Sequence, residues 1–132
     1  METLLVVDGA NVVGSVPDRW WQDRRGAAER LRDSLAAPGG QSAVAGPVEV
    51  VLVVEGAARG VASVPGVRVE SASGSGDDLI TELAATAAAA GRPCVVVTAD
   101  RGLRARVAAA GADCAGPRSV RRRTDPPCAG PR

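Results

Sequence analysis

Unbroken apolar runs constrain the fold of this chain more than any other sequence feature. Leu4 to Val7 leads without alternation into Asp8, and Val48–Val54 and Val95–Val97 have the same character. A strand with one face in water alternates apolar and polar residues, whereas a strand of a parallel α/β sheet is buried on both faces and is apolar throughout. We therefore expect these runs to be central strands of a largely parallel sheet.

Helical patterns separate the strands. The clearest is Asp77 to Ala90, which has acids in its first turn, an apolar face and a stop at Gly91. The remaining predicted segments are a loop at Val12–Val16, helices from about Asp18 to Ala36 and Arg101 to Ala110, a linker from Ala37 to Pro47, an irregular crossover at 57–66, and short strands at Val67–Glu70 and Ala112–Ala115. This alternation predicts an α/β three-layer sandwich with a mostly parallel central sheet.

The domain is expected to span residues 1–116, followed by a tail. Residues 117–132 are rich in Pro, Gly and Arg, which is typical of disordered segments. The tail carries five Arg and one Asp, whereas the rest of the chain carries 11 Arg and 14 acids. Arg121, Arg122 and Arg123 suit a basic arm that binds a polyanion, but a merely solvated tail is an equally good explanation.

Missing residue types exclude several classes of site. The chain has no His, and all 16 of its basic residues are Arg. Ser-His-Asp catalysis, His-based zinc sites, Schiff bases and a Walker A lysine are therefore excluded. Carboxylates without His or Lys favour hard cations such as Mg²⁺ or Mn²⁺. The abundance of Arg, Ala, Gly and Val without Lys indicates a GC-rich, bacterial genome.

The cysteines and the apolar runs predict a cytoplasmic protein. Cys94, Cys114 and Cys128 have no paired spacing, and the first two lie in apolar runs as buried thiols would. No basic segment precedes the first apolar run, and no apolar stretch is long enough to cross a bilayer. We expect a reducing, cytoplasmic setting.

Acidic residues follow the predicted strands one after another. Asp8 follows the first strand, Glu55 the second and Asp100 the fourth, while Asp77 and Asp78 open the helix after the third. The carboxyl ends of parallel strands share one edge, where like charges repel unless a cation neutralises them. The pattern predicts a divalent metal site at that edge.

Each acid also has a purely structural explanation. Asp77 and Asp78 favour a helix N-terminus, and Asp100 could cap the helix that follows it. For Glu55 the structural explanation is the favoured one, and Asp113 receives no role.

Three motifs carry a resemblance to a known family. Asp8-Gly-Ala-Asn11, the Gly-Ser-Gly-Asp77-Asp78-Leu-Ile segment and Val-Val-Thr98-Ala-Asp100-Arg-Gly-Leu occur in this order, each after a predicted strand. Together they resemble the NYN-domain branch of the PIN-like ribonucleases, of the YacP-like type, over about residues 3–115. The resemblance implies a metal-dependent endoribonuclease-like hydrolase that cleaves RNA phosphodiester bonds with one or two Mg²⁺ or Mn²⁺ ions.

The resemblance also implies roles for individual residues. Asp8, Asp77 and Asp100 would hold the metal, with Asp78 as a helper at the same helix start. Asn11 would orient Asp8 or contact a phosphate, and Thr98 would form a hydrogen bond within the site. Relatives often carry an acid at the position of Glu55, and the resemblance assigns it no defined role.

The substrate contacts are less sharply defined. Arg101 and Arg104 flank Asp100 and suit neighbouring phosphates, although solvated helix arginines are an equal alternative. Stacking on bases would rest on Trp20 or Trp21 alone, so a stacking platform is not expected.

Other functions compete with the ribonuclease. A haloacid-dehalogenase phosphatase would need a second Asp at Ala10 and a lysine, and both are missing. A catalytically weak or inactive RNA-binding or assembly module on the same fold is the main alternative, and a toxin of a toxin–antitoxin pair is a variant of the ribonuclease. RNA is the expected partner and no membrane is expected; a homo-oligomer and RNA-processing partner proteins stay open.

Overall fold

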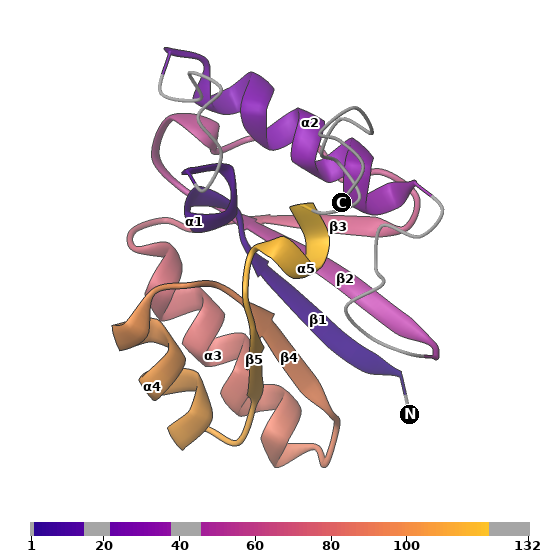
Figure 1. Ribbon diagram of the computed structural model, residues 1–132, viewed down its shortest axis with the longest axis vertical. Helices are drawn as coiled ribbons and strands as arrows, with labels where there is room; N and C mark the ends of the chain where they lie inside the picture. The colour runs from indigo at the N-terminus through magenta and orange to yellow at the C-terminus, as the bar shows by residue number, and fades with distance from the viewer. Residues whose placement is uncertain (1, 15–21, 38–45, 122–132) are drawn as a thin grey trace, which may run out of the picture.

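A five-stranded parallel sheet forms the centre of the molecule (Figure 1). The computed structural model describes residues 2–14, 22–37 and 46–121. The strands are β1 (Thr3–Asp8), β2 (Val48–Val54), β3 (Val67–Ser71), β4 (Cys94–Val97) and β5 (Asp113–Ala115), in the spatial order β3-β2-β1-β4-β5. Every pair of neighbouring strands is parallel. The predicted α/β class and parallel sheet are confirmed.

The strand order reverses at β1. The chain moves from β1 outward to β2 and β3, and then returns to place β4 on the other side of β1. Asp8 lies beside Val53 of β2, and Val7 lies beside Val97 of β4. Such a reversal leaves a crevice outside the carboxyl ends of the strands, where α/β proteins bind their ligands. Asp8 and the residues that follow Val97 therefore lie where a sheet of this kind most often binds a ligand.

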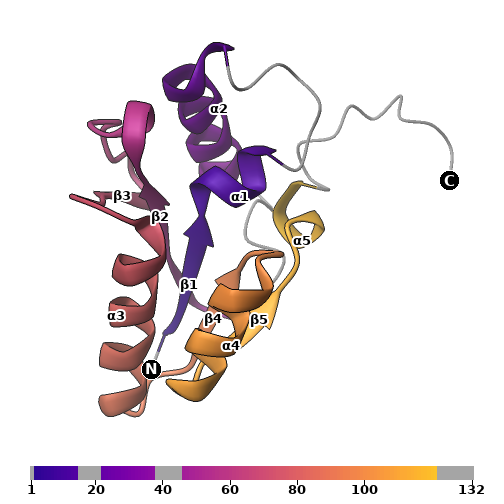
Figure 2. The same ribbon diagram turned by 90° about the vertical axis from the view of Figure 1, so that its left-hand side faces the viewer.

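Helices cover both faces of the sheet, as three layers require. α1 (Gly9–Gly14), α2 (Arg24–Ala36) and α5 (Arg118–Arg121) pack on one face. The other face is covered by α3 (Gly76–Ala89) and α4 (Arg101–Ala109), which contact each other. Figures 1 and 2 show α3 and α4 side by side in the lower part of the molecule, with α1 and α2 above them.

Aliphatic side chains build both halves of the core. Leu5, Leu31 and Leu52 are fully buried between the sheet and α2, and Val6, Ile80 and Leu103 are buried between the sheet and the α3–α4 pair. Burying such a side chain contributes roughly 1.5–3 kcal/mol. The predicted apolar faces of α3 and α4 are the faces that the structure buries.

The first helix differs from the prediction. The sequence pattern indicated a loop at Val12–Val16, whereas α1 begins at Gly9, directly after β1. Two glycines and two valines in six residues give this segment a low helix propensity, so tertiary contacts decide its conformation. The buried side chains of Val12 and Val13 supply those contacts.

α2 also begins later than predicted. Its first residue is Arg24, and Asp23 caps it by accepting a hydrogen bond from the backbone N–H of Gly26 at 2.9 Å. The predictions for Trp20, Trp21, Cys128 and most of the 37–47 linker fall outside the described residues. The 57–66 segment begins with the short helix η2 (Gly56–Ala58) and continues as irregular chain.

The chain after Gly116 begins with a helix rather than a disordered tail. Val120 of α5 is 1% exposed and belongs to the hydrophobic core on this face of the sheet. One valine in a segment of Arg, Pro and Gly gives too weak a pattern to indicate a helix. For residues 122–132 the disordered tail stays a prediction outside the described chain.

Among the helices that the structure describes, none is long and apolar enough to cross a lipid bilayer.

Candidate functional site

Asp8 is a buried carboxylate at the end of the central strand. Its residue is 5% exposed, and the neighbouring Thr98 is fully buried. The Thr98 hydroxyl donates to Asp8 Oδ2 at 2.9 Å, and the backbone N–H of Asn11 donates to Asp8 Oδ1 at 3.4 Å. The carboxylate is therefore fixed in orientation, with one oxygen held firmly and the other only by a long contact.

Thr98 and Asn11 connect Asp8 to the loop after β4. Besides donating to Asp8, the Thr98 hydroxyl accepts the backbone N–H of Asp100 at 3.1 Å. The Asn11 side-chain oxygen accepts the backbone N–H of Ala99 at 2.8 Å. These bonds fasten the start of α1 to the start of α4 across the crevice, so the predicted hydrogen-bonding residue and the predicted amide both lie beside Asp8.

Asp100 is the N-cap of α4. Its Oδ1 accepts the backbone N–H of Leu103 at 2.9 Å, which is the structural explanation that the sequence left open. A cap uses one carboxylate oxygen and leaves the charge in place. Asp100 therefore has a structural role, and its negative charge still acts on Asp77.

Asp77 lies in the first turn of α3, close to Asp100. Ser75 rather than Asp77 caps this helix, by accepting the backbone N–H of Asp77 at 3.1 Å. Partial burial raises the pKa of Asp77, and the charges of Asp100 and Asp78 raise it further. Arg106 acts in the opposite direction and lowers this pKa. Asp77 and Asp100 thus lie near enough to feel each other's charge.

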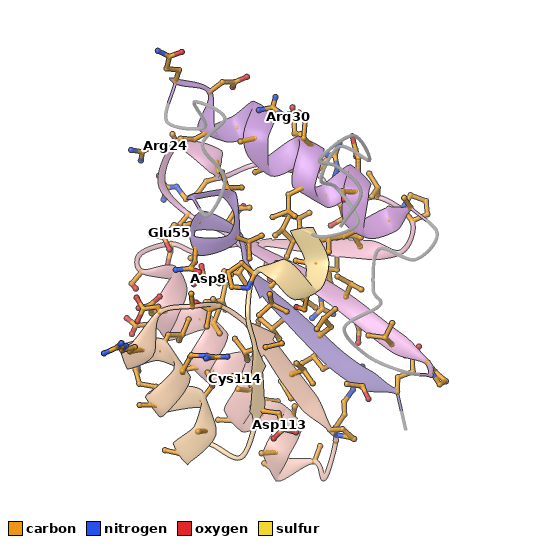
Figure 3. The ribbon with its side chains drawn as sticks, viewed as in Figure 1. Asp8, Arg24, Arg30, Glu55, Asp113 and Cys114 are labelled. Carbon is orange, nitrogen blue, oxygen red and sulfur yellow. The ribbon has the colours of Figure 1, made fainter. Side chains whose placement is uncertain are left out.

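Glu55 reaches from the end of β2 to the start of α3. Its Oε1 accepts the backbone N–H of Gly76 at 2.9 Å. A Cβ on residue 76 would lie 2.2 Å from this oxygen, so only glycine permits the contact. The structural role favoured for Glu55 is therefore present, and Figure 3 shows Glu55 next to Asp8 at the carboxyl ends of their strands.

Four carboxylates form one electrostatic group, which we call the carboxylate cluster: Asp8, Glu55, Asp77 and Asp100. Burial is the largest cause of the raised pKa of Asp8, and the charges of Asp77 and Glu55 raise it further. The hydrogen bonds from Thr98 and Asn11 lower it but do not compensate. Negative charge at Asp8 is thus incompletely neutralised by the protein itself.

Asp78 is exposed and does not belong to the carboxylate cluster. Its side chain is 75% exposed and forms an ion pair with Arg106 of α4 at 3.0 Å. Its charge raises the pKa of Asp77. Asp78 is therefore an exposed acid that is paired with a cation of the neighbouring helix.

The predicted phosphate-binding arginines differ in exposure. Arg101 is exposed at the start of α4, whereas Arg104 is half-buried and its Nε is buried without a hydrogen-bond partner. Arg106, which the sequence pattern did not single out, forms an ion pair with Asp78 and lowers the pKa of Asp77. Its spacing from Asp100 carries no signal, because only the packing of α4 on α3 brings it there. Asp113 lies away from the cluster on β5 (Figure 3).

The donor set of the cluster fits a hard divalent cation. Carboxylate and hydroxyl oxygens are the ligands that Mg²⁺ and Mn²⁺ prefer, and the raised pKa values of Asp8 and Asp77 indicate negative charge that a cation would stabilise. Within the described chain, no three acidic or cysteine side chains converge into a ready-made ligand group. Mg²⁺ is commonly held by one or two carboxylates, with water and substrate phosphate completing its shell, so the cluster fits such an open site.

Comparisons with known proteins identify the fold. No protein-family model matches the chain, and neither does any curated protein. The solved structure of Rae1 (YacP) from Bacillus subtilis, as its W164L mutant, is similar with a TM-score of 0.66 and 20% sequence identity. The similarity covers 90% of this chain and 72% of that one. The chain therefore has the YacP-like, NYN/PIN-like fold that its three motifs indicated.

Proposed function

We propose that this protein is a metal-dependent ribonuclease that hydrolyses RNA phosphodiester bonds at the carboxylate cluster. The observation that carries the proposal is the burial of Asp8 at the reversal of strand order, with its pKa raised by burial and by Asp77 and Glu55. Burying a carboxylate costs stability. Carboxylates with a pKa raised by burial and by neighbouring charges are therefore concentrated at functional sites. The resemblance to PIN-like ribonucleases supplies the substrate class.

Each residue of the cluster has a proposed role in metal binding or in positioning. Asp8, Asp77 and Asp100 would hold Mg²⁺ or Mn²⁺, and Asn11 and Thr98 act through Asp8. When bound, the metal lowers the pKa of a water molecule and neutralises charge on the phosphate. Thr98 fixes Asp8 Oδ2 through its hydroxyl at 2.9 Å, which leaves Oδ1 as the less engaged oxygen. Glu55 holds the start of α3, and hence Asp77, through the Gly76 N–H.

Cations at the rim suit a polyanionic substrate. Arg106 lies beside Asp77 and Asp78, and Arg101 is exposed at the start of α4. An arginine fork binds phosphate oxygens with two donors. We assign phosphate contacts on this side of the cluster to these two residues, and Arg104 serves there only if its half-buried side chain moves outward.

Cleavage assays with charge-neutral variants test the proposal. Single-stranded RNA would be incubated with Mn²⁺ and wild type, Asp8→Asn or Asp77→Asn. Asp113→Asn is the matched control, because it removes the same charge from an exposed position on β5. We expect loss of cleavage in the first two variants and wild-type cleavage in the control. Equal cleavage by all four proteins would identify a contaminating nuclease and refute the proposal.

Calorimetry separates metal binding from turnover. Titration of Mn²⁺ into the folded wild type should give heat that disappears in Asp8→Asn and Asp77→Asn and persists in Asp113→Asn. Thermal unfolding of each variant verifies that it is folded. Heat that is unchanged in all variants would remove the metal from the cluster.

A catalytically inactive RNA-binding module on the same fold is the second candidate. The observation that favours it is the use of Glu55 Oε1 and Asp100 Oδ1 as acceptors for backbone amides, which occupies oxygens that a metal would need. This alternative predicts RNA binding without cleavage, with equal affinity in wild type and Asp8→Asn. A gel-shift assay run beside the cleavage assay distinguishes the two.

A further inference from the structure

A small pocket lies directly beside the carboxylate cluster, on the side of α1 and α2. Its volume is about 140 Å³. Ala10 and Val13 of α1, Ala28 of α2 and Ala58 of η2 give it apolar walls, and Arg24 and Glu55 add a guanidinium and a carboxylate. The proposed metal site makes no use of this space.

The pocket and the cluster share one residue. Glu55 lines the pocket and also raises the pKa of Asp8, so it belongs to both. Gly9, another lining residue, is the neighbour of Asp8 in the chain. A Cβ on Gly9 would lie 2.6 Å from the carbonyl oxygen of Val53, so glycine alone allows α1 to approach β2 this closely. Figure 3 shows Arg24 and Glu55 on the same side of the molecule.

Size and chemistry together select one kind of occupant. An apolar cavity of about 150 Å³ accommodates one benzene ring, so a pocket of about 140 Å³ suits a six-membered ring better than a purine. Apolar walls suit the faces of an aromatic base, while a carboxylate acceptor and a guanidinium donor suit the polar groups of its edge. A pyrimidine has both.

We propose that this pocket binds one pyrimidine base of an RNA strand, next to the phosphate that lies at the carboxylate cluster. The inference rests on the proposed ribonuclease function and adds a sequence preference to it. Ala10 and Ala58 then act as specificity-determining residues, because their small side chains leave the space that the base occupies.

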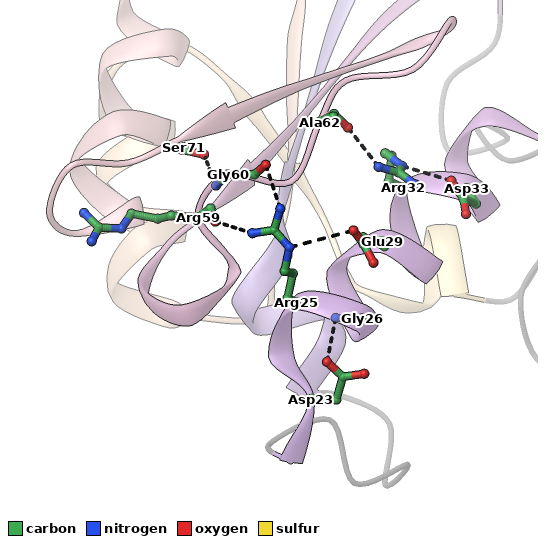
Figure 4. A network of polar contacts seen from close by, with 10 residues as sticks. All are labelled: Asp23, Arg25, Gly26, Glu29, Arg32, Asp33, Arg59, Gly60, Ala62 and Ser71. Atoms are coloured by element: carbon green, nitrogen blue, oxygen red, sulfur yellow. Dashed lines mark hydrogen bonds and ion pairs between the residues drawn. The ribbon is translucent and has the colours of Figure 1, made fainter.

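Hydrogen bonds hold one wall of the pocket in place. Arg25 of α2 donates to the carbonyl oxygens of Arg59 and Gly60 at 2.9 and 3.1 Å, and Arg32 donates to that of Ala62 at 3.0 Å (Figure 4). These bonds join α2 to the chain that follows η2. A pocket whose walls are already ordered binds with a smaller entropic cost.

Mapping of cleaved bonds tests the proposal. A pool of single-stranded RNA with random sequence would be digested with Mn²⁺, and the new ends would be sequenced. We expect wild type to prefer C or U over A or G, by about tenfold or more, at one fixed position beside the cleaved bond. Ala10→Leu fills the pocket from an exposed position on α1, and it should abolish this preference.

Two further variants control for unrelated effects. Ala57→Leu makes the same change at an exposed residue of η2 that does not line the pocket, and it should keep the preference. Ala58→Leu fills the pocket from another wall and should act like Ala10→Leu. Circular dichroism verifies that each variant is folded. A preference that survives both filling variants would overturn the pocket assignment while leaving the ribonuclease proposal intact.

Binding of mononucleotides makes the two proposals distinguishable. Calorimetry with CMP, UMP and AMP should show binding of the first two to wild type, about tenfold weaker binding of AMP, and loss of all binding in Ala10→Leu. If wild type cleaves no RNA but shows this pattern, the ribonuclease proposal fails and the pocket assignment stands. Equal binding of CMP and AMP, or binding unaffected by Ala10→Leu, would refute the pocket assignment whether or not RNA is cleaved.

Discussion

Replacing Thr98 by valine removes a single hydroxyl from the centre of the site. The two side chains have nearly the same shape, and residue 98 is fully buried, so the packing is retained. The hydroxyl donates to Asp8 Oδ2 at 2.9 Å and accepts the Asp100 N–H at 3.1 Å. Hydrogen bonds to a charged group contribute about 1.5–3 kcal/mol. The second bond is a neutral one and is only partly buried, so its loss contributes less. We expect Thr98→Val to lower the free energy of unfolding by about 2–3 kcal/mol at neutral pH.

This cost should depend on pH. The Thr98 bond lowers the pKa of Asp8, while burial raises it above 3.8, so the variant has a higher pKa still. At a pH below 3.8, Asp8 is protonated in the folded and unfolded chain, and only a neutral hydrogen bond of about 0.5–1.5 kcal/mol is lost. The difference between wild type and variant should grow as the pH rises through the folded-state pKa values. Urea unfolding at a series of pH values measures it.

Thr81→Val is the matched control for this experiment. The Thr81 hydroxyl donates to the backbone carbonyl of Asp77 at 2.8 Å, so its loss breaks a bond to a neutral acceptor. Its cost should be smaller and should not change with pH in the same range. Equal and pH-independent costs for both variants would refute the idea that Thr98 stabilises an ionised Asp8.

Other predictions concern stability and thiol reactivity. Asp8→Asn should raise the free energy of unfolding at pH 7, because burial raises the pKa of Asp8, and the gain should vanish as the pH falls to 3.8, as urea unfolding would show. Asp100→Ala should cost about 0.5–2 kcal/mol through loss of the α4 cap, whereas Asp100→Asn keeps the cap, and thermal unfolding compares the two. Val120→Ala should cost about 2 kcal/mol if α5 closes the core, and no change would contradict that packing. Burial raises the pKa of Cys94 to about 11, so it should resist alkylation at pH 8 until urea unfolds the chain, as peptide mass mapping would show.

The sheet and the acidic edge followed from local patterns. The Val48–Val54 run coincides with β2, and the start of α4 at Arg101 was visible from Asp100 and the apolar spacing that follows it. In buried strands and amphipathic helices, the spacing of apolar residues indicates which side chains are buried. These elements can therefore be predicted without knowledge of the tertiary structure. The same patterns placed Asp8, Asp77 and Asp100 at the ends of different elements.

Contacts between residues that are distant in the chain could not be predicted from the sequence. Nothing near Glu55 indicates that it accepts the N–H of Gly76, and nothing near Asp78 indicates Arg106. α1 and α5 are short and poor in helix formers, so they depend on the core that Val13 and Val120 enter. Features that tertiary packing imposes on a weak local signal have no periodicity to reveal them.

The bonds from Thr98 and Asn11 have a consequence for synthesis on the ribosome. Thr98 and Asp8 are separated by 90 positions along the chain, and Ala99 and Asn11 by 88. An emerging polypeptide that lacks β4 and the residues after it can form neither bond, because Thr98 and Ala99 are missing from it. The hydrogen bonds that orient Asp8 are therefore completed only after β4 and the loop that follows it have left the ribosome.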